Sequence, residues 1–523
     1  MSATAIIRAG LREVRVAFTP PERLNALLKQ GGLSVDQPCG GRGKCGKCRV
    51  RAAGALRPAE PSELAKLTDA DRDGGIRLAC MAVAEGDVEI TLLDASSEKI
   101  MTGFALPDLK GQAWGEGLGL AVDIGTTTLA AYLYDLDCAQ LLAVESCPNP
   151  QRAFGADVTS RLKASMEGER EALQARITDA LSQMTQALLD RAGRKGEPLH
   201  CAVVTGNTAM LYLLTGREVS SIAFAPFEPS TRFGDFVDAS AIGLPAPTRV
   251  YLPRCSAAYV GADITCAMLY AGFLSDESPC GAPRLLVDIG TNGEMALCAG
   301  GHIYTCSTAA GPAFEGAGIR YGMTARDGAI CRASFDGQRM QWQSLGGRAT
   351  GICGSGLVDA IAALLDAGAL DDSGCLQVSG HALEACMTEL DGQPAFRFEG
   401  SDVFLTQADV RAVQLAKAAI CAGILVLLDA AGVAVEDVAA LELAGGFGSC
   451  IRPETAARIG LIPQSLASRA HVLGNAAGAG ASMMLLSRRC LQADALVDSR
   501  CTTIELSSNA DFSDAFVDCM GFE

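Results

Sequence analysis

The stretch RLLVDIGTNGEMALCA, residues 284–299, has a related copy earlier in the chain, GLAVDIGTTTLAAYLYD at residues 119–135. Each copy reads as a buried strand, a turn that begins Ile-Gly-Thr, and a second strand, because apolar residues dominate both flanks. Asp288 stands where Asp123 stands, 165 residues earlier. Since an internal repeat defines architecture, the pair predicts a duplicated α/β domain with a cleft between its lobes.

The residues that follow each first strand have the chemistry of a phosphate site. An aspartate at a strand end can hold Mg²⁺ through water, and the glycine and threonine after it offer N–H groups and hydroxyls to phosphate oxygens. One such turn alone could be ordinary packing, but two facing copies could grip a polyphosphate. No G-x4-G-K-[ST] loop occurs. The predicted loops are Asp123, Gly125, Thr126 and Thr127, and Asp288, Gly290, Thr291 and Asn292.

Two further glycine clusters suit a nucleotide site. Leu441–Phe447 (LELAGGF) is an apolar strand followed by glycines, which would let the backbone lie against a base or ribose. Ile352–Leu365 (ICGSGLVDAIAALL) predicts a glycine-rich turn that opens a helix. Each cluster alone could be a structural turn, and the combination with both phosphate loops favours a nucleotide cleft. The candidate contacts are Gly354, Ser355, Gly356, Gly445, Gly446 and Phe447.

Hydrolysis of a bound nucleotide requires a carboxylate near the terminal phosphate that orients or deprotonates water. Glu294, four residues after Gly290, is the candidate for this role. The alternative for Glu294 is a strand residue in a salt bridge. Asp123 and Asp288 are candidate ligands of Mg²⁺ or of water.

Four cysteines near the N-terminus follow the spacing C-x5-C-x2-C-x31-C. Three lie in the loop CGGRGKCGKC and the fourth on a distant strand, as in ferredoxin-type [2Fe–2S] sites. The loop glycines allow the backbone to wrap closely and to aim N–H groups at the cluster sulfurs. The alternative is structural zinc, which prefers paired C-x2-C knuckles, and this region has one such pair. The candidate ligands are Cys39, Cys45, Cys48 and Cys80.

The composition limits the classes of partner. The net charge of −17 argues against a nucleic-acid-binding surface. Residues 1–95 differ from the rest, with 14 Lys and Arg against 12 Asp and Glu, which could steer an acidic electron-transfer partner. Met1–Leu11 lacks a secretory signal, and the apolar run Ala418–Leu428 is too short to span a bilayer. A cytoplasmic protein with reduced thiols and no membrane is therefore expected.

The pattern along the chain predicts its division. Ile6–Phe18 reads as a strand hairpin, Pro21–Gln30 as a helix and Asp87–Leu93 as a closing strand, whereas Gly168–Arg191 reads as a long amphipathic helix. The predicted division is a [2Fe–2S] ferredoxin-type domain at 1–95, a linker at 96–117, a first lobe at 118–280 and a second lobe at 281–523.

Both halves resemble known families. The cysteine loop resembles the β-grasp ferredoxins, with the five-residue spacing of the adrenodoxin branch. The order of the three nucleotide motifs resembles the acetate kinase, sugar kinase, Hsp70 and actin superfamily, in which two motifs are phosphate loops and the third contacts adenosine. The implied fold class is an α+β β-grasp ferredoxin domain followed by a duplicated α/β actin-like (ribonuclease H-like) ATPase domain.

The combination resembles the reductive activators of corrinoid proteins over nearly the full chain, including Gly206–Met210 (GNTAM), Ala310–Gly318 (AGPAFEGAG) and Leu405–Ile420. This resemblance implies ATP-dependent reduction of a Co(II) corrinoid to Co(I) in an anaerobic methyltransferase system. The implied cofactors are a [2Fe–2S] cluster, ATP and Mg²⁺. The implied partners are a corrinoid protein and a low-potential electron donor, either a ferredoxin or a reductase, and assembly as a homodimer stays open.

Three other functions use the same parts. A small-metabolite kinase would use the same cleft and leave the cysteine domain unexplained. An Hsp70-like metallochaperone would hydrolyse ATP without passing an electron to any acceptor. An ATP-dependent activator of another low-potential metalloenzyme, such as an acyl-CoA dehydratase, is the third; such activators resemble this chain less because their cluster lies at a dimer interface.

Overall fold

The structure is a computed structural model that describes residues 2–9, 12–33, 35, 37, 41–44, 46–67, 69–93, 103–107, 109, 113–155, 157–275, 281–448 and 450–522. The chain forms two compact units, each described by itself. One unit contains Met1–Ser97 and Pro148–Ile177, and the other contains Glu98–Cys147 and Thr178–Glu523.

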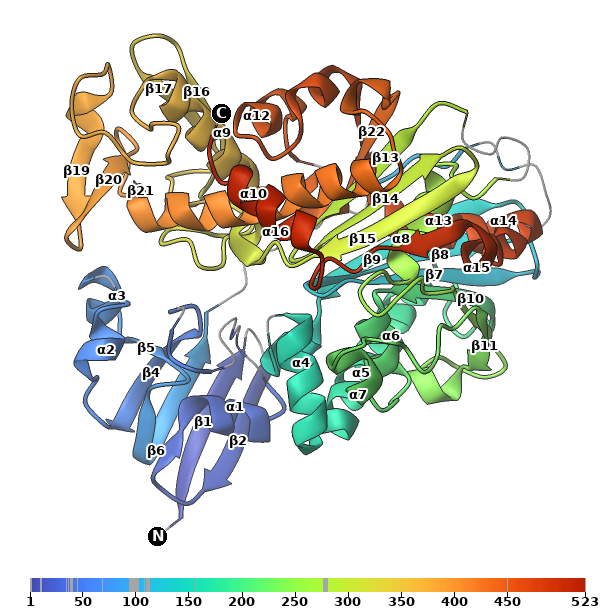
Figure 1. The fold of residues 1–523 in the computed structure, drawn as a ribbon. Coiled ribbons are helices and arrows are strands. Elements are labelled where there is room, and N and C mark those ends of the chain that lie inside the picture. Colours follow the sequence, from blue (N-terminus) through green and yellow to red (C-terminus); the bar gives the residue numbers. More distant parts are fainter. Residues whose placement is uncertain are drawn as a thin grey trace. The chain divides into compact units, whose positions relative to one another are not determined.

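The first unit is built on one mixed sheet with a helix on its face (Figure 1). Helix α1 (Leu24–Gln30) buries Leu24, Leu27 and Leu28, which share one face because they are three and four residues apart. Short helices α2 (Pro61–Leu64) and α3 (Asp69–Asp73) follow β4. This is the arrangement expected of a β-grasp sheet. The strands, in spatial order, are β2 (Arg12–Phe18), β1 (Ala3–Ala9), β6 (Val83–Leu92), β4 (Arg49–Leu56) and β5 (Ile76–Leu78), with β3 (Glu22–Arg23) beside β6.

A second segment of the chain belongs to the same unit. It comprises η1 (Pro150–Ala153), α4 (Val158–Ala164), the π-turn η2 (Ser165–Glu169) and the start of α5 (Arg170–Arg191). Lys29 at the end of α1 pairs with Glu169 at 2.7 Å and lies 5.0 Å from the centre of the Phe154 ring. Helix α5 begins at Arg170, two residues after the predicted start at Gly168. Gly168 lies in the preceding turn and has a φ of 100°. The residues of α5 from Thr178 onward belong to the second unit.

The second unit contains two six-stranded sheets with the same internal plan. In each sheet an antiparallel meander of three strands adjoins a parallel strand, so β7, β8, β9 and β10 correspond to β13, β14, β15 and β22. The first sheet has the order β11 (Asp235–Asp238), β12 (Arg249–Leu252), β10 (Leu199–Gly206), β7 (Leu118–Ile124), β8 (Thr128–Asp135) and β9 (Gln140–Pro148). The second has the order β23 (Ala470–Gly474), β22 (Ala440–Ala444), β13 (Arg284–Ile289), β14 (Gly293–Ala299), β15 (His302–Thr308) and β24 (Cys501–Thr503).

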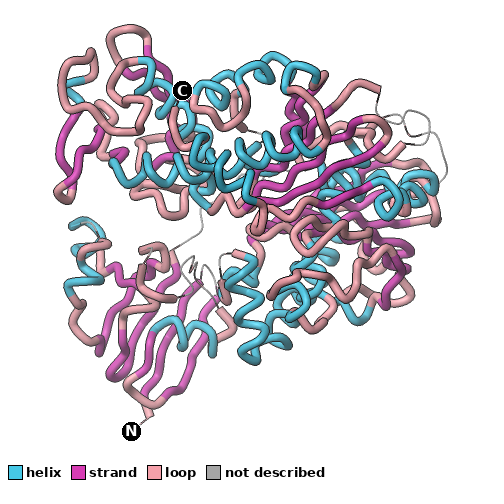
Figure 2. The backbone as a smooth tube through the Cα atoms, in the orientation of Figure 1, coloured by secondary structure: helices cyan, strands magenta, loops and turns pink. Residues whose placement is uncertain are grey.

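Helices flank these sheets (Figure 2). Helices α8 (Ala262–Tyr270) and α13 (Ala476–Leu486) pack against each other at Gly480, where a side chain would meet the backbone oxygen of Cys266. The remaining helices of this unit are α6 (Thr208–Leu214), α7 (Ser220–Ala223), α9 (Gly354–Asp366), α10 (Gln407–Ala430), α11 (Gly445–Gly448), α12 (Pro453–Arg458), α14 (Arg488–Ala493), α15 (Leu496–Arg500) and α16 (Ala510–Asp518).

Helix α10 is part of the core. Among the described residues it is the one helix long and apolar enough to cross a membrane, but 72% of its most apolar window is buried in the protein. Helix α16 lies beside it (Figure 1). Two small sheets complete the unit: β17 (Met340–Ser344), β16 (Ala329–Phe335) and β18 (Gly351–Ile352), and β19 (Met387–Leu390), β20 (Gln393–Arg397) and β21 (Phe404–Thr406).

Candidate functional site

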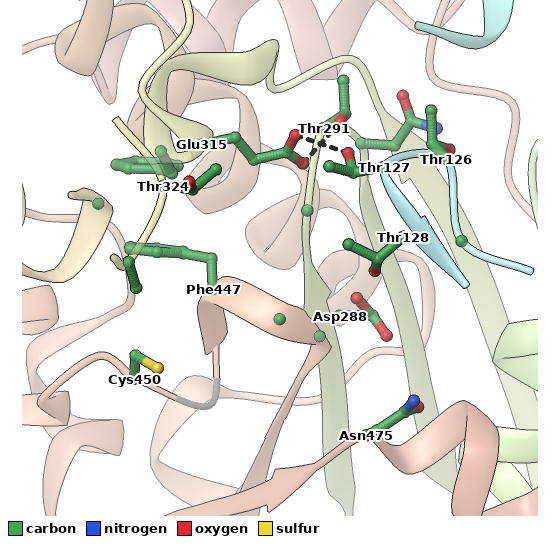
Figure 3. A pocket seen from close by; sticks show the side chains of 18 of the residues that line it. Thr126, Thr127, Thr128, Asp288, Thr291, Glu315, Thr324, Phe447, Cys450 and Asn475 are labelled. Carbon is green, nitrogen blue, oxygen red and sulfur yellow. Dashed lines mark hydrogen bonds between the residues drawn. The ribbon is translucent and has the colours of Figure 1, made fainter. Parts of the chain in front are cut away.

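A cavity of about 270 Å³ lies in the second unit, lined by residues from both large sheets (Figure 3). It brings together every nucleotide-site candidate of the sequence analysis except Gly356. Gly356 lies inside α9, where a side chain would meet the backbone oxygen of Ile330, so its small size serves the packing of α9 on β16. The cavity is near the lower end of the size range of small-molecule sites.

The two predicted phosphate loops connect antiparallel strand pairs. Strands β7 and β8 place Asp123 opposite Ala130, and β13 and β14 place Asp288 opposite Glu294. The turn between β13 and β14 is closed by a hydrogen bond from the Gly290 N–H to the Asn292 carbonyl, at 3.0 Å. Each turn therefore begins at the glycine that directly follows an aspartate-isoleucine pair, as the repeat predicts.

Two asparagines that the sequence analysis did not select hold the first loop. Asn475 donates to the Asp123 carboxylate at 2.9 Å, and Asn207 donates to the Thr126 hydroxyl at 3.0 Å. The side-chain oxygen of each asparagine caps a helix, α13 and α6 respectively. Asparagine at the N-cap position after a short strand is the sequence signal that could have identified them. The amide of each residue thus ties a helix start to the phosphate loop.

Four acidic side chains meet in the cavity wall, with an accessible edge on Asp123, Asp263 and Asp288. Burial raises the pKa of Asp123 to about 6. Burial and the Asp123 charge raise the pKa of Asp288 to about 7, and burial with both charges raises that of Asp263 to about 8. Burial and the charges of Asp263 and Asp288 raise the pKa of Glu294 well above its usual value. No lysine, arginine or histidine is among the described residues that line the cavity.

This acidic group is a candidate site for a hydrated cation. Within the described part of the chain, no three acidic, histidine or cysteine side chains are placed to hold one metal ion directly. Mg²⁺ commonly keeps several of its waters and uses one or two carboxylates. Asp263 was missed by the sequence analysis because it lies in the first turn of α8, outside any recognisable motif.

The third nucleotide motif, Leu441–Phe447, closes one side of the cavity. Gly445, with a φ of 86°, follows β22, and a side chain there would meet the Asp288 carboxylate and lie 2.7 Å from the Ile289 carbonyl oxygen. The Phe447 ring stacks on Phe314, with 4.6 Å between ring centres and 6° between ring planes. An apolar wall of this kind suits one face of a nucleobase.

Replacement of Gly445 by alanine is expected to destabilise the second unit by about 2–4 kcal/mol, which combines the penalty of a left-handed backbone with that of overpacking. The reason is the approach of the new methyl group to the Asp288 carboxylate and to the Ile289 carbonyl oxygen. Thermal denaturation followed by circular dichroism measures the effect. The matched control is Gly446→Ala, because a side chain at Gly446 meets nothing within 4 Å. Equal melting temperatures for the two variants would contradict the packing argument.

A further carboxylate, Glu315, connects the two loops. Its side chain accepts hydrogen bonds from the Thr127 hydroxyl at 2.8 Å and from the Thr291 hydroxyl at 2.6 Å (Figure 3). Glu315 ends the short helix η4 (Pro312–Glu315) within the AGPAFEGAG stretch. The sequence analysis quoted this stretch and assigned no role to its glutamate.

In the first unit, two of the four candidate cluster cysteines are described. The Sγ atoms of Cys48 and Cys80 lie 3.3 Å apart, and both residues are buried. The hydrogen bond from Cys48 lowers the pKa of Cys80 to about 6. Gly41, Gly43 and Gly46 have φ values between 66° and 74°, a conformation that other residues rarely adopt. Cys39 and Cys45 lie outside the described residues.

Three family models match the chain. The C-terminal domain of RACo, the ASKHA domain, matches residues 282–523, and the RACo middle region matches residues 118–276. A 2Fe-2S iron–sulfur cluster binding domain matches residues 10–85. The predicted fold class, a ferredoxin-type domain followed by an actin-like ATPase domain, is confirmed.

Individual relatives agree with these matches. The corrinoid activation enzyme RamQ of Eubacterium limosum is 33% identical over 420 residues, which cover 76% of this chain and 69% of RamQ. The [Co(II) methylated amine-specific corrinoid protein] reductase of Methanosarcina barkeri is 28% identical over 408 residues, which cover 71% of this chain and 70% of the reductase. A solved structure of a reductive activator for corrinoid, iron–sulfur protein aligns with 99% of this chain and 98% of its own, at 28% identity and a TM-score of 0.69.

Proposed function

Because the chain belongs to the family of corrinoid activation enzymes, we propose that it couples ATP hydrolysis to the reduction of a partner's corrinoid from Co(II) to Co(I). The observation that carries this proposal is the presence in one chain of two kinds of site. One is a buried pair of thiols, Cys48 and Cys80, in a ferredoxin-type fold. The other is a cavity where two phosphate loops face an acidic group.

The coupling has a thermodynamic reason. A plant-type [2Fe–2S] cluster has a reduction potential near about −400 mV. A one-electron acceptor that lies ~120 mV lower is reduced to only about one part in a hundred at equilibrium, since 59 mV corresponds to a factor of ten. ATP can overcome this barrier by changing the affinity for the partner between two conformations, so that the reduced partner is released.

In the first unit, the proposed cluster ligands are Cys39, Cys45, Cys48 and Cys80. The separation of the Cys48 and Cys80 sulfurs and the glycine-rich backbone beside them fit thiolate ligation of iron. When bound there, a [2Fe–2S] cluster supplies one electron at low potential. The four cysteines would hold the cluster, and the burial of Cys48 and Cys80 excludes water from this thiol pair.

In the second unit, the backbone N–H groups of both loops are proposed to bind the phosphates of ATP. Asp123 and Asp288 are proposed to hold Mg²⁺ through water. The described residues that line the cavity include no lysine, arginine or histidine, which fits such a cation. Gly354, Ser355, Gly445, Gly446 and Phe447 would contact the nucleoside. Glu294 stays a candidate for the residue that activates water.

The partner is proposed to be a corrinoid protein of a methyltransferase system, and the electron donor a low-potential ferredoxin or reductase. The excess of basic residues in 1–95 suits an acidic donor. A cytoplasmic location and a homodimer belong to the same proposal. The proposed domain division is 1–95, 96–117, 118–280 and 281–523.

The function is tested anaerobically with the cluster-loaded full chain, a chemical reductant and a Co(II) corrinoid protein. We expect the absorbance of Co(I) to grow much faster with Mg-ATP than with Mg-ADP, because only ATP can drive a cycle of conformations. A small-molecule phosphate acceptor should receive no phosphoryl group. Equal rates of Co(I) formation with ATP and with ADP would refute the coupling.

A further inference from the structure

We propose that Glu315 is the catalytic carboxylate that orients and deprotonates the water molecule that attacks ATP. The inference rests on ATP hydrolysis by the second unit, as proposed above. In hydrolysis, the water oxygen forms a bond to the terminal phosphorus, and the bond from this phosphorus to the bridging oxygen breaks with its electrons staying on ADP. Glu315 accepts the proton of the water and later returns it to solvent.

The first argument is position. The hydroxyls that donate to Glu315 come from Thr127 in one phosphate loop and Thr291 in the other, so the carboxylate lies where both loops point. A terminal phosphate held by the N–H groups of these loops would lie beside the two threonines, whose hydroxyl protons are donated to Glu315. Figure 3 shows Glu315 next to both threonines, whereas Asp288 lies apart from this group, beyond Thr128. Glu315 is thus the acidic side chain that accepts hydrogen bonds from the hydroxyls of both loops, and Asp288 lies in a separate part of the cavity.

The second argument is that the backbone holds Glu315 in place. Gly316, the next residue, has a φ of 79°, and a side chain there would meet the Met323 N–H and lie 2.8 Å from the Gly322 carbonyl carbon. On the other side, the Phe314 ring is buried against Phe447. A catalytic group on a turn that is packed on both sides loses little entropy when the substrate is positioned.

The third argument is hydrogen-bonding capacity. Each Glu315 oxygen accepts one hydroxyl, and a carboxylate has about four lone-pair sites, so further donors can be accepted. Within the described part of the chain, no lysine or arginine forms an ion pair with Glu315. The side chain remains half-buried and accessible from the cavity. These are the properties of a base that can receive a water molecule.

Glu294, the candidate from the sequence, has a different environment. Its carboxylate accepts a hydrogen bond from Asn292 at 3.2 Å, and only 7% of the residue is exposed. It is opposite Asp288 in the pairing of β13 and β14. From this position, Glu294 can hold the second loop and its neighbour Asp288 in place. The role of activating the water therefore falls to Glu315.

The test compares Glu315→Gln and Glu315→Asp with Glu294→Gln and the surface control Glu436→Gln in the full cluster-loaded chain. The rate of phosphate release is measured together with the affinity for ADP by calorimetry. For Glu315→Gln we expect kcat to fall by about 10²–10⁴-fold, the usual contribution of a general base, with unchanged affinity for ADP. Glu315→Asp should retain part of the activity, and sodium formate should partly restore a Glu315→Ala variant.

Three outcomes overturn the inference. One is a wild-type kcat in Glu315→Gln. Another is tighter nucleotide binding by Glu315→Gln with unchanged kcat, which would show that Glu315 only competes with phosphate for the same site. The third is loss of ADP binding in both Glu315→Gln and Glu315→Asp. Failure of the proposed function is seen separately, as wild-type protein that hydrolyses ATP and forms no Co(I).

Discussion

The Cys48→Ala variant is expected to form no Co(I) above the background of the reductant alone, although it still hydrolyses ATP. Cys48 is 1% exposed and its sulfur lies 3.3 Å from that of Cys80, so its replacement by alanine removes a buried thiol from the proposed ligand set. Three remaining thiolates leave one iron with an incomplete set of ligands. The measurements are iron content, visible absorbance and anaerobic Co(I) formation with Mg-ATP.

The control for this experiment is Cys138→Ala. Cys138 is an exposed cysteine of the second unit, so its loss removes a thiol without touching the proposed ligands. This variant should have the wild-type iron content. If purified wild-type protein contained zinc instead of iron, or if Cys48→Ala retained Co(I) formation, the electron-transfer proposal would be wrong. Cys45→Ala should behave like Cys48→Ala.

The Asp288→Ala variant is expected to lose ATP hydrolysis and to keep its cluster, the opposite of Cys48→Ala. Its rate of ATP hydrolysis should fall by on the order of 10²–10³-fold, comparable to removal of one preorganised contact in an active site. The reason is that Asp288 lies at the end of β13, next to the second phosphate loop and in the acidic group proposed to hold Mg²⁺. The stimulation of Co(I) formation by ATP should vanish, while the visible spectrum of the cluster stays intact.

A binding measurement separates this prediction from a general loss of structure. In wild-type protein, Mg²⁺ should strengthen the binding of ADP, and in Asp288→Ala this dependence on Mg²⁺ should be lost. Asp437→Ala, an exposed aspartate of the same unit, serves as the control. Wild-type dependence of ADP affinity on Mg²⁺ in Asp288→Ala would show that this carboxylate does not serve the cation.

Much of the fold could be predicted from the sequence, because the internal repeat indicates a duplicated domain. The aspartates at 123 and 288 end corresponding strands of two sheets with the same plan, which is what a duplicated motif requires. Helix α1 and the mixed sheet of the first unit follow from the short periodic segments around the cysteine loop. Positions of helix ends were harder, since α5 begins two residues later than predicted because of the turn at Gly168.

The parts of the site that escaped prediction depend on distant segments of chain. Asp263 reaches the cavity because α8 packs on α13, and Asn475 reaches Asp123 across 352 positions. Asp263 has no local signature. The N-cap position of Asn475 marks a helix start but does not show that its amide reaches Asp123, because this contact depends on how the helix packs against the sheet. Glu315 lies in a quoted motif, but only the three-dimensional structure shows that two threonine hydroxyls from separate halves converge on it.

The placement of one phosphate loop in each sheet also has a mechanical consequence. A triphosphate bound as proposed contacts both loops, so it would add to the resistance of the two halves against separation. The force needed to unfold the chain by pulling, and its resistance to a protease that cuts between the halves, should therefore be greatest when nucleotide is bound. The lifetime of the nucleotide would then set how long the two halves move as one body.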